Sequence, residues 1–96
     1  MNADANAYRL AALLQDALHY RWAADGNDRS AFAGTDEFEG RAEPRSWARR
    51  ALERYNTAAQ LAGIPTVKNG RNLEAKINAL AAAYRIDAAR GEVVAS

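Results

Sequence analysis

The feature that most constrains this chain is the segment of residues 71–90, which carries apolar residues along two lines of a predicted helix. One line consists of Leu73, Ile77, Leu80 and Tyr84. At about 100° per residue, the second line lies roughly half a turn away. It consists of Ala75, Ala79, Ala82, Ile86 and Ala89. A helix that is apolar on two sides needs neighbours on both. We therefore expect this helix to lie at the centre of the fold. The second line is expected to mediate self-association into a homodimer, with packing inside its own chain or simple exposure of helix-promoting alanines as the alternatives.

Composition narrows the class of protein. The chain has 96 residues, of which 49% are hydrophobic, and this suits a single domain with one core. It has no cysteine, so disulfide frameworks and thiolate metal sites are excluded. The net charge of +1 does not by itself favour nucleic acid. We find no signal-peptide pattern and no apolar stretch of the roughly 18 residues that span a bilayer, and therefore expect a soluble cytoplasmic protein.

The first helix is predicted over residues 4–25, followed by Gly26 in the left-handed position that ends helices. Arg21 falls within its apolar stripe, and we expect its stem to cover the edge of the core while its head either lies in water or pairs with Asp25, four residues on. The core-facing residues of this helix are predicted to be Leu10, Leu13, Leu14, Ala17 and Leu18.

The second helix is predicted over residues 44–62. Pro44 suits the first helical position, and Gly63 followed by Ile64 is typical of a Schellman ending. The helix carries an apolar stripe at i, i+3, i+4 spacing. The residues of the stripe are Trp47, Ala48, Ala51, Leu52, Tyr55, Ala58, Ala59 and Ala62. The loop that follows leads to the third helix, which either Asn69 or Asn72 is expected to cap.

Two charged segments are candidate partner-binding surfaces. A basic face on and before the second helix consists of Arg41, Arg45, Arg49, Arg50 and Arg54. Guanidinium groups bind carboxylates and phosphates in bidentate fashion, although a solvated face would show the same pattern. The connector over residues 26–43 has the glycine-rich composition of loops and short turns. Its acidic and aromatic contact residues are predicted to be Asp36, Glu37, Phe38 and Glu39.

The sequence contains only partial matches to the motifs that mark DNA-binding, metal-binding or catalytic proteins. The spacing of Ala59, Gly63 and Ile64 resembles a helix-turn-helix, but Asn69 would then stand where a buried apolar residue is required, and Gly70 inside the recognition helix. A calcium loop fails for similar reasons. The chain has a single histidine and no phosphate-binding glycine loop, so we expect no catalytic residues, no metal and no cofactor.

These observations predict an all-α fold, a small antiparallel three-helix bundle with a connector of loops and short turns between its first two helices. The expected function is a non-enzymatic protein-binding module, such as an adaptor, an assembly subunit or an inhibitor. One version is a phage or mobile-element protein that blocks a host enzyme such as a defence nuclease. The alternative is a nucleic-acid-binding accessory protein that uses the basic face.

Overall fold

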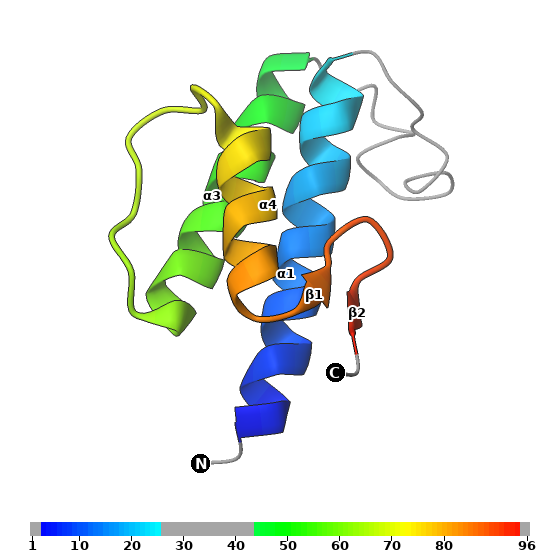
Figure 1. The fold of residues 1–96 in the computed structure, drawn as a ribbon. Coiled ribbons are helices and arrows are strands. Elements are labelled where there is room, and N and C mark those ends of the chain that lie inside the picture. The colour runs from blue at the N-terminus through cyan, green and yellow to red at the C-terminus, as the bar shows by residue number, and fades with distance from the viewer. Residues whose placement is uncertain (1–2, 26–43, 95–96) are drawn as a thin grey trace.

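The computed structural model describes residues 3–25 and 44–94, and the architecture of these residues is all-α with a very short hairpin (Figure 1). This confirms the fold class predicted from the sequence. The elements in chain order are α1 (Ala3–Ala24), α3 (Pro44–Ala62), α4 (Leu73–Ala83), β1 (Ile86–Asp87) and β2 (Glu92–Val93).

The central element is α1, not the C-terminal segment. The helices α3 and α4 both run antiparallel to α1 and pack against it, and the hairpin also contacts α1 (Figure 1). Because α1 has neighbours on more than one side, it buries Tyr20 and Ala23 as well as the predicted stripe, of which Leu13 is only partly buried. The Tyr20 ring lies 5.7 Å from the ring of Trp47 on α3. The expectation that the third helix would be central is therefore wrong, because α1 is the helix with apolar surface for several neighbours.

The core is built from a few large side chains and many alanines. Alanines without exposed surface line both α1 and α3, and small side chains at a contact allow two helices to approach closely. These alanines are Ala17, Ala23, Ala51, Ala58 and Ala59. The largest fully buried side chains are Trp47, Leu10, Leu14, Leu73 and Ile77.

The end of α3 is the predicted Schellman motif. The Ile64 N–H donates to the Ala59 carbonyl at 2.9 Å, and the Gly63 N–H donates to the Gln60 carbonyl at 3.2 Å. Gly63 has φ 77, the left-handed conformation that glycine adopts without steric cost. These bonds satisfy carbonyl groups that the helix end would otherwise leave unpaired.

The loop between α3 and α4 runs from the end of α3 back to the opposite end of the bundle, where α4 begins (Figure 1). Asn56 on α3 holds the middle of this loop. Its Nδ2 donates to the Val67 carbonyl at 2.9 Å, and its Oδ1 accepts from the Val67 N–H at 2.9 Å. Asn72 occupies the N-cap position of α4 at φ 55, as one of the two alternatives expected, but its side chain makes no cap hydrogen bond. The Asn69 side chain instead accepts a hydrogen bond from the Arg71 N–H within the loop.

Replacing Asn56 with alanine should lower the free energy of unfolding by about 1–3 kcal/mol, because both backbone groups of Val67 lose their partner in a part-buried place. The exposed Gln60, on the same helix, provides the matched control. Gln60→Ala should change stability by no more than about 0.5 kcal/mol. Urea unfolding followed by far-UV circular dichroism measures both variants, and equal costs would contradict the role assigned to Asn56.

The helix predicted over residues 71–90 ends at Ala83, and a hairpin takes its place. Tyr84 has φ −109 and Arg85 has φ 55, values that leave the helical region. The chain then turns back so that Ile86 pairs with Val93. Ile86 is only 7% exposed, whereas a continued helix would have carried it on the outer line. Burying such a side chain contributes about 1.5–3 kcal/mol, which favours the hairpin over further helix.

The turn of the hairpin lies against α1. Gly91 has φ 65, and a Cβ built on it would lie 2.5 Å from Oε1 of Gln15. Any other amino acid at this position would place a Cβ against Gln15, so only glycine allows both the left-handed conformation and the close approach. The Asp87 carboxylate accepts a hydrogen bond from the Arg90 N–H at 3.2 Å within the same turn. Gly91 therefore allows the hairpin to close on α1.

Candidate interaction surface

The basic face predicted on α3 is partly used inside the molecule. The guanidinium carbon of Arg54 lies 5.8 Å from the centre of the Tyr20 ring on α1. Its Nε lies 3.8 Å from a carboxylate oxygen of Asp16, also on α1. Arg54 therefore contributes to the contact between the two helices through its ring contact and ion pair. Its side chain remains partly exposed at the edge of the predicted basic face.

The remaining arginines of this face differ in exposure. Arg49 is exposed, whereas Arg50 is half-buried and its Nη1 has no contact with solvent. The side chains of Arg41 and Arg45 lie outside the described residues, so the structure does not place them. The acidic connector also lies outside the described residues, which applies to Asp36, Glu37, Phe38 and Glu39.

The predicted self-association line does not form one continuous helix face. Ile86 belongs to β1 and is buried against the chain's own core, and Ala89 lies in the turn of the hairpin. The physical reason is the helix end at Ala83, beyond which helical spacing no longer relates one residue to the next. The three members that remain on α4 are Ala75, Ala79 and Ala82.

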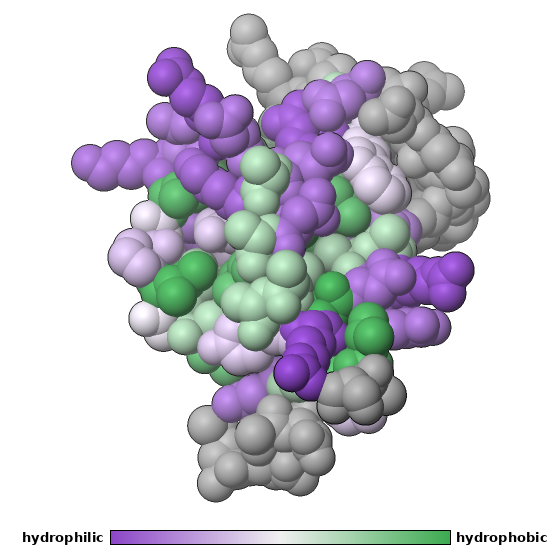
Figure 2. All heavy atoms as spheres, viewed as in Figure 1, coloured by the Kyte–Doolittle hydropathy of each residue, from purple (hydrophilic) through white to green (hydrophobic). Residues whose placement is uncertain are grey.

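These three exposed alanines define what we call the outer α4 face. The opposite side of the helix buries Leu73, Ile77, Leu80 and Ala81. Figure 2 shows a pale green, moderately hydrophobic band over α4 with hydrophilic side chains beside it. Charged residues close to the band in sequence are exposed at both ends of the helix. They are Arg71, Glu74 and Arg85.

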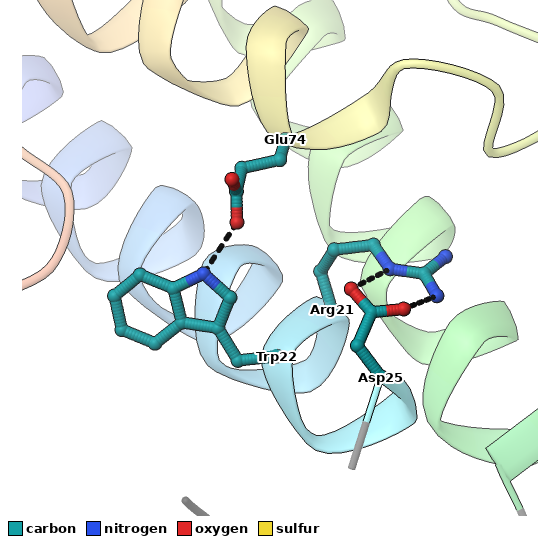
Figure 3. Close-up of polar contacts among 4 residues, drawn as sticks. All are labelled: Arg21, Trp22, Asp25 and Glu74. Carbon is teal, nitrogen blue, oxygen red and sulfur yellow. Dashed lines mark hydrogen bonds and ion pairs between the residues drawn. The ribbon is translucent and has the colours of Figure 1, made fainter. Parts of the chain in front are cut away.

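A polar cluster joins the end of α1 to the start of α4 (Figure 3). Nε1 of Trp22 donates a hydrogen bond to the carboxylate of Glu74. Beside it, Arg21 pairs with Asp25, with Nη2 and Oδ1 at 2.5 Å, which is one of the two arrangements expected for its head. No local sequence pattern predicts the hydrogen bond between Trp22 and Glu74, because 52 residues separate them.

His19 links the same region to the hairpin. Its ring stacks on the Trp22 ring, with centroids 5.4 Å apart and planes inclined by 19°. Its Nε2 donates to the carbonyl of Ala89 at 3.0 Å, which requires the proton on that nitrogen. His19 is the single histidine of the chain, and the sequence pattern did not indicate this structural role. In the structure, His19 and Trp22 together hold α4 and the hairpin turn to α1.

Within residues 3–25 and 44–94, no group of three or more histidine, cysteine, aspartate or glutamate side chains could hold a metal ion. The indole of Trp22 donates to Glu74, and the guanidinium of Arg21 donates to Asp25, so these polar groups bond to partners within the chain. Among the described helices, none is long and apolar enough to cross a membrane.

Comparison with known proteins identified no relative. Neither a family model, nor a curated protein, nor a solved structure matches the chain.

Proposed function

We propose that this chain is a small non-enzymatic protein-binding module, and that the outer α4 face is the centre of its contact surface. The observation that carries the proposal is the exposure of Ala75, Ala79 and Ala82 on a helix whose other side is packed into the core. A rigid, core-anchored helix with an apolar exposed side can receive a partner at little cost in conformational entropy.

The surroundings of the face support a protein partner. Protein interfaces combine an apolar centre with a polar rim, and exposed aromatic residues contribute strongly to binding. Tyr84, which directly follows α4, is 40% exposed, and Arg71 and Arg85 provide charge at the two ends. Small side chains in the centre allow a partner helix or a large side chain to approach the backbone closely. An adaptor, an assembly subunit or an inhibitor of a larger enzyme would each use such a surface.

The nucleic-acid alternative has less support from the described residues. Arg54 contacts Tyr20 and Asp16, so it is not available to phosphates without breaking these contacts. The long loop from Gly63 to Asn72 separates α3 from α4, where a helix-turn-helix needs a turn of about three or four residues. We therefore retain nucleic acid as an outcome to be tested and protein as the proposed partner.

If the outer α4 face is the contact surface, a partner should be captured by a crosslinking group placed on it. A photo-crosslinking amino acid at position 79 should give a dominant protein adduct in a lysate of the native host, whereas the same group at the exposed Gln60 on α3 should not. An excess of the untagged chain should compete for the partner and reduce the adduct, whereas the untagged Ala79→Glu chain should not. This substitution should change the free energy of unfolding by no more than about 0.5 kcal/mol.

The outcomes of this experiment separate the alternatives. An adduct of twice the chain's mass identifies a second copy as the occupant and supports the homodimer expected from the sequence. A nucleic-acid adduct that is lost as salt is raised supports the alternative, because phosphate contacts weaken steeply with salt. Equal labelling from positions 79 and 60 would contradict an interaction surface on α4.

A further inference from the structure

We propose that Asn69 and Gly70 form a self-modifying site, at which the side-chain amide of Asn69 is lost by attack of the Gly70 backbone nitrogen. The site lies on the loop between α3 and α4 and needs water as its only co-reactant. This proposal is independent of the function proposed above, because it follows from the geometry of the loop alone.

The fold holds the reacting groups together. Asn69 is exposed, and its Oδ1 accepts a hydrogen bond from the Arg71 N–H at 3.0 Å. This bond closes an Asx turn, in which the side chain of Asn69 folds back toward the peptide that follows it. Gly70 has no Cβ that would hinder the approach. Holding two reacting groups in place in this way raises the rate of the step that joins them.

The charges around the site favour the same step. Attack on Cγ places negative charge on Oδ1 of Asn69, the oxygen to which the Arg71 N–H already donates. The attacking nitrogen must also lose its proton. A Cβ built on Gly70 would lie 3.7 Å from Nη1 of Arg21, so a guanidinium group lies beside this residue. Lys68 adds a second cation one residue before Asn69, and positive charge stabilises the anionic nitrogen.

The reaction balances without further reagents. The nitrogen of Gly70 forms a bond to Cγ of Asn69 and gives up its proton, while the bond from Cγ to Nδ2 breaks and ammonia leaves with that proton. The product is a five-membered cyclic imide. Water then adds to one of its two carbonyl carbons. One direction of opening leaves aspartate at position 69, and the other leaves an isoaspartyl link in which the main chain runs through the former side chain.

Both products would alter the start of α4. The new carboxylate changes the net charge from +1 to 0, since +1 − 1 = 0, and it lies next to Arg71. The isoaspartyl link also lengthens the main chain by one carbon between two fixed points. One is Val67, held by Asn56, and the other is the buried Leu73, whose N–H donates to the Gly70 carbonyl at 3.1 Å.

The test is site-resolved mass spectrometry of the whole purified chain after incubation at mildly alkaline pH. Cleavage after lysine releases residues 69–76, which contain Asn69 and Asn72, and residues 77–96, which contain Asn78. We expect Asn69 to gain the mass difference between an amide and an acid at least about tenfold faster than the other two, a difference of about 1.4 kcal/mol in activation free energy.

The matched control is Gly70→Ala, which should slow the reaction by a similar factor. Alanine fits at this position because its Cβ makes an ordinary contact and Gly70 lies outside the left-handed region. Equal rates at Asn69 and Asn78, or an unchanged rate in Gly70→Ala, would overturn the proposal. Incubation in urea tests the contribution of the fold: a folded chain that reacts much more slowly than the unfolded chain would show that the loop protects Asn69, and would also overturn it.

Discussion

Trp47→Ala is expected to lower the free energy of unfolding by about 3–5 kcal/mol, the range for removing a buried aromatic side chain from a core. Trp47 is 1% exposed and packs between α3 and α1 beside the Tyr20 ring. Because domains of this kind are stable by only about 5–15 kcal/mol, this loss is a large fraction of the total free energy of unfolding. Urea titration followed by far-UV circular dichroism measures the loss independently of tryptophan fluorescence.

Tyr84→Ala is the control for this prediction. The apolar spacing of residues 71–90 placed Tyr84 on the buried line, but it is 40% exposed because the helix has already ended. Its removal should change stability by no more than about 0.5–1 kcal/mol. A cost for Tyr84→Ala as large as that for Trp47→Ala would contradict the helix end at Ala83 and restore the helix over residues 71–90.

Ile86→Ala is expected to cost about 2–5 kcal/mol of unfolding free energy, because it leaves a cavity under the hairpin. Ile86 is 7% exposed, and it belongs to β1 rather than to the outer face of a long helix. If Ile86 instead belonged to a self-association line, its replacement would lower the mass of the particle in solution and leave the stability of the monomer unchanged. Light scattering and urea unfolding on the same samples distinguish these two results.

The matched control for Ile86 is Val94→Ala, on the residue that follows β2. Val94 is 52% exposed, and its backbone N–H already donates to the Arg85 carbonyl at 2.7 Å, a bond that alanine retains. We expect Val94→Ala to leave stability within about 0.5 kcal/mol of the unchanged chain. A reduced particle mass for Ile86→Ala without loss of stability would show that Ile86 serves an interface instead of the core.

Local signals predicted α3 well because its boundaries depend on near neighbours. Pro44 begins the helix, and the Gly63 and Ile64 bonds that end it reach only to Gln60 and Ala59. The pairing of Arg21 with Asp25 was predictable for the same reason, since residues four apart lie on one side of a helix. In these places, the residues that interact are already close along the chain.

The C-terminal segment shows the limit of such signals. Alanine-rich residues around position 82 favour helix strongly, and nothing in the local pattern marks Ala83 as the last helical residue. The hairpin is more favourable than a continued helix because it places Ile86 and Ala88 against the core, and because Gly91 lets the turn approach Gln15 on α1. Helix propensity amounts to tenths of a kcal/mol per residue, whereas burying one isoleucine contributes several times more.

The contact surface was predictable only in part. The outer alanines of α4 follow from helical spacing, but the use of Arg54 against Tyr20 and Asp16 does not. Exposure of a charged residue depends on which helix lies beside it, and that choice is not encoded in the charge pattern of a single helix. One residue of the expected basic face, Arg54, therefore also contributes to the interface between α1 and α3.

The sequence by itself determined the helical class, the ends of α3 and the buried stripes, since these depend on spacing and on bonds between residues a few positions apart. Only the tertiary structure decided that α1 is central, that the last helix stops at Ala83 and that His19, Trp22 and Asn56 tie distant segments together. Their partners are 70, 52 and 11 residues away. Such contacts form only when packing has brought the segments side by side, so their energy is invisible in any local window of the chain.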